Sequence, residues 1–288
     1  MKNLTTPHRC PANQIRYTTT DRRPIVITAP EQLDAKIVSN EYTEQGGIIT
    51  FNRSLHRIGD NAFMGCSNLV TITLPDGIRH FGKNPFKECV ALKYINSSFA
   101  STDGLCLVFD NAIKSFAIGS GERHYIVPEG IVSIDEEAFS YCVSLRDIII
   151  GNDVESVESG AFYYCIALEN VILGDRVNMV GNNAFMGCSN LTNIILGSRI
   201  STIGESTFYY CSNLANVAFG RGVQSIGNSA FRGCSALKTV ILPKGIKSIG
   251  SYVFMRCPSL SAIVCGNRES LQSLALELPI GCKVYSEE

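Results

Sequence analysis

The chain repeats one pattern, which is clearest in the stretch Val180-Gly181-x-x-Ala184-Phe185-x-x-Cys188-x-x-Leu191-x-x-Ile194-x-Leu196. In every copy a Cys lies three residues after the Phe, and a Leu lies three residues after that Cys. The step between copies is 23 residues, except for one step of 53 residues between Phe86 and Phe139. The eight copies are centred on Phe63, Phe86, Phe139, Phe162, Phe185, Phe208, Phe231 and Phe254. A fixed period of about 20 to 50 residues predicts a solenoid, in which each coil buries its apolar side against its neighbours.

Each coil contains two kinds of local pattern. Ile194 and Leu196 alternate with polar or outward positions, as in a β-strand, whereas Phe185 and Cys188 are three residues apart, as on a helical turn. Asn182 lies near the start of that turn, where a polar side chain can cap free N–H groups. The pattern therefore predicts an α/β repeat solenoid, with a parallel β-sheet and short helical or 3₁₀ segments.

The stretch from Ile226 to Pro243 resembles the BspA-type leucine-rich repeat family, which occurs in bacterial surface proteins. The resemblance covers about three quarters of the chain. It implies a right-handed leucine-rich-repeat coil, with the parallel sheet on a concave face and the helical or 3₁₀ segments on a convex face. It also implies a role in cell adhesion or protein–protein contact, and it supplies no catalytic residues and no cofactor.

The repeats divide the chain into three parts. We interpret residues 1–48 as a β-rich N-terminal cap, residues 49–266 as the solenoid, and residues 267–288 as a C-terminal cap. Residues 48–51 are expected to form the first strand of the parallel sheet. The long step contains an insert at residues 98–122, in which Asp110-Asn111 separates two apolar runs and predicts a β-hairpin. This hairpin is either a projecting binding element or a tolerated variant of the repeat.

Eight of the twelve cysteines occupy one column of the repeat, beside the Phe and Leu columns. A column of this kind predicts buried free thiols, because an unpaired Cys behaves as a small hydrophobic residue. The sequence has no Cys-x-x-Cys pair, so no metal site is expected. The other four cysteines are better placed for a disulfide, and their redox state stays open: Cys10, Cys106, Cys265 and Cys282.

Charge and hydropathy exclude several classes of function. The chain has 25 Lys and Arg against 26 Asp and Glu, a net charge of −1, so no nucleic-acid partner is expected. No stretch has the roughly 20 apolar residues of a transmembrane segment, and the N-terminus lacks the pattern of a signal peptide. The free thiols suit the cytoplasm, whereas the family resemblance implies the cell surface, so localisation stays open. The four histidines fall in unrelated phases of the repeat, and we expect no enzyme.

Two columns of strand residues are predicted to point away from the core, onto the concave face. We interpret them as a surface that binds a protein partner, including a host or matrix protein, because contiguous exposed apolar patches usually mark interaction sites. Strand preference of β-branched residues alone is the other interpretation. The alternative function is an intracellular scaffold or a self-associating structural protein. The apolar column contains Ile149, Ile172, Ile195 and Ile241, and the neighbouring column contains Tyr94, Asp147, Asn170, Asn193 and Asn216.

Overall fold

A computed structural model describes residues 10–265 and 278–286 of the chain. These residues form two compact units. Unit 1 comprises residues up to 109 together with residues 114–120, and unit 2 comprises residues 110–113 and the chain from residue 121 onward. The chain passes from one unit to the other at the hairpin of β8 (Cys106–Phe109) and β9 (Ala112–Phe116), where Asp110 and Asn111 both have positive φ angles.

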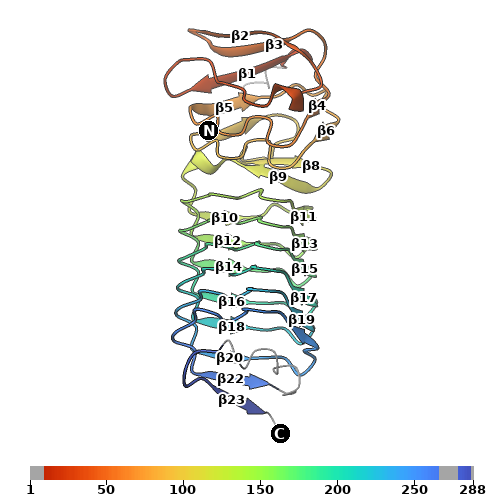
Figure 1. Cartoon of the computed structure of the whole chain (residues 1–288). Coiled ribbons are helices and arrows are strands. Elements are labelled where there is room, and N and C mark those ends of the chain that lie inside the picture. The colour runs from red at the N-terminus through yellow and green to blue at the C-terminus, as the bar shows by residue number, and fades with distance from the viewer. Residues whose placement is uncertain (1–9, 266–277, 287–288) are drawn as a thin grey trace, which may run out of the picture. The chain divides into compact units, whose positions relative to one another are not determined.

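Unit 2 is a β-solenoid in which five successive coils, over residues 124–226, each contribute one strand to each of two sheets with parallel pairing between coils (Figure 1). Pairing follows the 23-residue repeat, so that Ile148 lies beside Val171 and Val157 beside Val180. This confirms the predicted parallel-strand solenoid. The first sheet contains β10 (His124–Ile126), β12 (Asp147–Ile149), β14 (Asn170–Ile172), β16 (Asn193–Ile195) and β18 (Asn216–Ala218). The second begins with the hairpin of β8 and β9, and β9 pairs in parallel with the next strand of the sheet. Its other strands are β11 (Ser133–Ile134), β13 (Ser156–Val157), β15 (Met179–Val180), β17 (Thr202–Ile203), β19 (Ser225–Ile226) and β21 (Ser248–Ile249).

The core of unit 2 is built from columns of identical side chains. The ring centroids of Phe162 and Phe185 are 5.2 Å apart, those of Phe185 and Phe208 are 5.6 Å apart, and both pairs are parallel within 2°. The Cys column is buried beside them. From Cys165 to Cys257, each thiol reaches the carbonyl oxygen of the Phe one coil earlier, as in the 3.2 Å contact of Cys188 Sγ with Phe162 O. A buried thiol thus supplies both apolar volume and a weak hydrogen bond.

The predicted helical segments are wrong. Within the described part of the chain, helical structure is limited to two 3₁₀ turns outside the repeat pattern, η1 (Pro30–Gln32) and η2 (Ile118–Ser120). In all eight coils the residues two before and two after the Phe have positive φ, as Asn183 (57°) and Gly187 (76°) do around Phe185. Left-handed residues on both sides of the Phe interrupt any right-handed helix, because helices of L-residues need negative φ throughout.

A third column of backbone hydrogen bonds replaces the missing helices. Asn183 N–H donates to Glu205 O at 2.9 Å, Phe185 N–H to Thr207 O at 2.9 Å, and Gly187 N–H to Tyr209 O at 2.8 Å. The side chain of Asn182 also binds the next coil, because its Oδ1 accepts a hydrogen bond from Glu205 N–H at 2.8 Å. It therefore does not cap a helix in its own coil.

At its other end, unit 2 has a separate three-stranded parallel sheet of β20 (Thr239–Ile241), β22 (Ala262–Cys265) and β23 (Lys283–Ser286). β18 and β20 come from consecutive coils but belong to different sheets, so the ladder of the first sheet ends at β18.

Unit 1 departs from the repeat at its start. β3 (Gly46–Phe51) was predicted as the first parallel strand, but it pairs antiparallel with β1 (Gln14–Thr19) and with β2 (Ile37–Thr43). β1 also pairs antiparallel with β5 (Leu69–Thr73) and so separates β3 from the repeat strands. Only from β5 to β7 (Tyr94–Asn96) does the sheet become parallel, and β4 (Arg57–Ile58) and β6 (His80–Phe81) form a second parallel pair.

A first prediction concerns Gly187, whose φ of +76° is combined with close contact to a ring. A Cβ added there would lie 3.0 to 3.2 Å from three ring carbons of Tyr164, whereas one added at Gly130 (φ +79°) would have no atom within 4 Å. Gly130→Ala should cost about 1 to 2 kcal/mol of backbone strain. Gly187→Ala should cost more, since Tyr164 must also move. Adding Gly187→Ala to Tyr164→Ala should cost no more than Gly130→Ala does. Urea unfolding of the four variants measures this, and equal losses for the two Gly variants would contradict it.

A second prediction concerns the thiol column. Burial raises the pKa of the Cys165, Cys188, Cys211 and Cys234 thiols, and raises the pKa of Cys257 from near 9 to about 11. The folded protein holds these thiol protons more tightly than the unfolded chain does. The protonated thiols therefore contribute their full share to the free energy of unfolding below about pH 9, and this contribution is lost as the pH rises through the thiol pKa of the folded state.

The test is urea unfolding of the wild type and of Cys257→Ser between about pH 8 and about pH 11. The wild type should lose about 2 to 3 kcal/mol more stability than the variant over this range, which corresponds to the pKa shift of Cys257. Cys282→Ser, at a half-buried site, is the control and should retain nearly the full loss. Identical pH profiles for the wild type and Cys257→Ser would refute the prediction.

Candidate functional site

An exposed apolar row crosses the first sheet of unit 2 and ends on β20, the first strand of the three-stranded sheet. Side chains alternate along each strand, so Ile148, Val171 and Ile194 enter the core and the residues after them point outward. Their exposed fractions range from 40% at Ile149 to 71% at Ile195. We call this feature the Ile row and define it, one residue per coil, as Ile126, Ile149, Ile172, Ile195, Ala218 and Ile241.

A polar row runs beside it, two residues earlier in each strand. His124 Nδ1 lies 2.5 Å from Asp147 Oδ2, and Asn170 Nδ2 donates to Asp147 Oδ1 at 2.6 Å. Further along, Asn216 Nδ2 donates to Asn193 Oδ1 at 2.8 Å. These bonds fix the amide orientations, so the polar row presents a fixed set of donors and acceptors.

Eight of the nine predicted site residues lie on unit 2, in the predicted columns. Asp147, Asn170, Asn193 and Asn216 form the polar row with His124, and Ile149, Ile172, Ile195 and Ile241 belong to the Ile row. Tyr94 instead lies on β7 of unit 1, where it is 44% exposed and its ring contacts Gly104. Tyr94 therefore belongs to a different unit from the other eight.

Sequence reasoning missed His124 and Ile126. The insert interrupts the Phe count before β10, and the histidines were interpreted as unrelated to the repeat. The signal that could have found both residues is Tyr125, which is buried and pairs with Ile148, so its two neighbours must point outward.

The coils that carry the Ile row differ strongly in charge. Residues 126–196 contain ten Asp and Glu but only two Arg. Residues 197–265 contain seven Lys and Arg but only one acidic residue, Glu205. The same change occurs in the turns that follow the strands, where the exposed Glu129 and Asp175 give way to the exposed Arg221 and Lys244.

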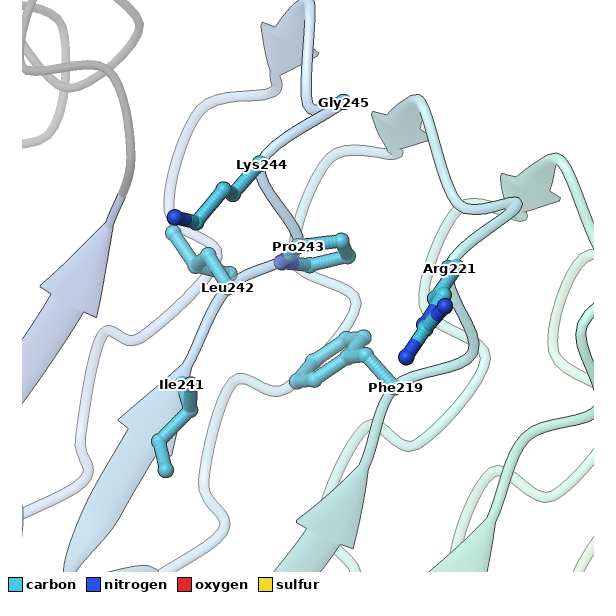
Figure 2. A pocket seen from close by; sticks show the side chains of 7 residues that line it. All are labelled: Phe219, Arg221, Ile241, Leu242, Pro243, Lys244 and Gly245. Carbon is cyan, nitrogen blue, oxygen red and sulfur yellow. The ribbon is translucent and has the colours of Figure 1, made fainter. Parts of the chain in front are cut away.

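A pocket of about 580 Å³ adjoins the end of the Ile row, where the ladder breaks between β18 and β20. Phe219 stands where neighbouring coils have Leu196 and Leu242, and its ring meets Phe231 edge-on at 5.7 Å. In Figure 2 the ring of Phe219 lies between Pro243 and the guanidinium of Arg221, and Ile241 extends from the adjacent strand. The pocket thus continues the apolar surface of the row and adds positive charge at its rim.

Among residues 10–265 and 278–286, no group of three or more His, Cys, Asp or Glu side chains could hold a metal ion. In the same part of the chain, no helix has the length and apolar character needed to cross a membrane.

Stacked parallel strands with a 23-residue Phe–Cys–Leu repeat define a leucine-rich-repeat solenoid, a fold that is generally non-catalytic and mediates protein contacts. A family profile for the BspA type leucine rich repeat region matches six copies over residues 41–121 and 132–261. The chain belongs to this family, as the sequence pattern predicted.

Two solved structures illustrate the similarity. A leucine rich cell surface protein from Faecalibacterium prausnitzii is 25% identical, with a TM-score of 0.56, over 77% of this chain and 54% of that one. A leucine-rich repeat protein from Eubacterium ventriosum is 22% identical, with a TM-score of 0.59, over 66% of this chain and 53% of that one. The matched region spans about half the length of these relatives. No curated protein matches the sequence significantly.

Proposed function

We propose that this chain is a non-enzymatic interaction module that binds a protein partner through the Ile row and the polar row. The observation that carries the proposal is the run of isoleucines between 40% and 71% exposed on consecutive strands. Neighbouring strands lie about 4.8 Å apart, so these side chains form a contiguous apolar strip. Such strips on soluble proteins usually mark interaction surfaces, because leaving them in water favours association.

The two rows have complementary tasks in this proposal. Ile149, Ile172, Ile195 and Ile241 supply the apolar contact area. The polar row supplies hydrogen bonds, and its amides already hold each other in place, which lowers the entropy cost of ordering them on binding. Tyr94, on unit 1, is proposed as a separate exposed contact position.

The similarity to a cell surface protein supports adhesion, to a host or matrix protein, as the biological setting. An interior scaffold is the alternative setting, and it is compatible with the twelve free cysteines. Both settings use the same surface, so the surface can be tested before the setting is known.

The test is site-specific photo-crosslinking in the cells that make the protein. A benzophenone amino acid replaces Ile172 on β14 or, as the matched control, Thr202, which is exposed on the second sheet. We expect a discrete adduct from position 172, none from position 202, and loss of the adduct when Ile195→Asp is added. Absence of any adduct at position 172 would count against the proposal.

A folding control separates binding from stability. Ile195→Asp, at a 71% exposed position, should change the free energy of unfolding by less than about 0.5 kcal/mol. Ile194→Asp, one residue away but 2% exposed, should cost more than about 4 kcal/mol, because it buries an unpaired charge. Circular dichroism and urea unfolding measure both changes.

A further inference from the structure

We propose that the partner of the Ile row is a second copy of this chain, packed face to face with its coils running in the opposite order. This inference rests on the proposed function, since it names the occupant of the same surface. Three features of unit 2 support it: the spacing of the Ile row, the order of the polar row, and the distribution of charge.

The Ile row matches itself under a two-fold rotation. An axis parallel to the strands, passing between β14 and β16, keeps each position along the strand and reverses the order of the coils. It places Ile172 opposite Ile195, Ile149 opposite Ala218, and Ile126 opposite Ile241. Every large residue then faces another isoleucine or a small alanine, which is the self-complementarity that a two-fold interface requires.

The polar row matches itself under the same rotation. Asp147 comes opposite Asn216, so a carboxylate acceptor meets an amide donor. Asn170 comes opposite Asn193, and amides can both donate and accept. His124 comes opposite Thr239, whose hydroxyl can also donate or accept.

Charge selects the reversed order over the parallel one. With the coils reversed, the acidic coils of residues 126–196 face the basic coils of residues 197–265 in the other copy. In the turns after the strands, Glu129 comes opposite Lys244. Arg221 comes opposite Asn152 and its neighbour Asp153. The four charged side chains are all exposed: Glu129, Asp153, Arg221 and Lys244. With the coils in the same order, the acidic coils would face each other as a group and so would the basic coils, which is unfavourable.

One contact opposes the arrangement. In the residues just before the strands, Arg123 comes opposite Lys238, and both are exposed. The neighbouring charges on that side are already compensated, because Arg146 and Glu169 pair at 3.6 Å within one copy. The Arg123–Lys238 repulsion therefore gives a variant that should strengthen the dimer.

The shape and size of the face suit a weak dimer. The rings of Phe162, Phe185 and Phe208 are parallel within 2°, so the central coils stack with little rotation, and the Phe rings on either side are tilted by 13° to 23°. The five paired strands from β10 to β18, at a spacing of about 4.8 Å, and β20 beyond them give a face about 25 Å long. Two such faces bury on the order of 1,000 Å² in total, near the lower limit for a specific interface.

The experiment is sedimentation velocity of the full chain over a concentration series, at about 0.05 M and about 0.5 M salt. We expect a monomer–dimer equilibrium that is weaker at the higher salt concentration. Ile172→Asp should give a monomer at every concentration. Glu129→Lys should weaken the dimer about fivefold, because the contact occurs twice by symmetry.

Two further variants fix the arrangement. Adding Lys244→Glu to Glu129→Lys should restore the dimer, and Lys238→Glu should strengthen it. Glu205→Lys is the control, because it makes the same change in net charge three residues before Phe208, away from the strand face, and it should leave the dimer nearly unchanged.

The outcomes separate this inference from the proposed function. A chain that is monomeric at every concentration overturns the second copy as partner, whereas the adduct at position 172 still tests the surface itself. That adduct should join two copies, through a peptide around Ile195. A dimer that Ile172→Asp leaves intact overturns the face, and a double charge reversal that fails to restore association overturns the reversed order.

Discussion

The backbone of each coil in unit 2 finds its hydrogen-bond partners mainly in the next coil. Three columns of such bonds run along the stack: the two parallel sheets and the third column around each Phe, where Phe185 N–H donates to Thr207 O. Buried N–H and C=O groups cannot be left without partners. Every coil must therefore keep the same length and the same path as its neighbours, and the constant 23-residue step follows from this constraint.

The columns of side chains depend on the same constraint. With coils in strict register, the Phe rings stack on one another, as Phe162 does on Phe185, and from Cys165 onward each column thiol reaches the Phe carbonyl of the coil before. The left-handed residues beside each Phe have the same origin, since they turn alternate N–H groups toward the neighbouring coil. Their local strain persists because the surrounding bonds determine the path of the chain.

The surface inherits this order. A side chain that points outward in one strand has an equivalent in every other strand, so one isoleucine per coil becomes a strip and one amide per coil becomes a row. Where a coil departs from the pattern, the surface changes: Phe219 in a leucine position coincides with the break between β18 and β20 and with the pocket beside Ile241. The coils are acidic at one end of the apolar strip and basic at the other, so the two ends differ in charge, whereas a uniform repeat would have identical ends.

The sequence by itself determined the coil length, the buried Phe, Cys and Leu columns, and eight residues of the two exposed rows, because strand alternation acts between adjacent residues. It did not determine what lies beside each Phe. A three-residue spacing such as Phe185 to Cys188 fits a helical turn, and it also fits a non-helical segment that bonds to the next coil. Only the carbonyl groups of the next coil, which accept the N–H bonds of this segment, distinguish the two conformations. The sequence pattern did not identify His124 and Ile126, because the insert interrupts the 23-residue spacing of the Phe positions before β10. The buried Tyr125 between them nevertheless indicates that both point outward. Only the tertiary structure decided that β1 separates β3 from β5, and that Tyr94 belongs to the other unit, because pairing between distant segments depends on contacts that no local pattern encodes.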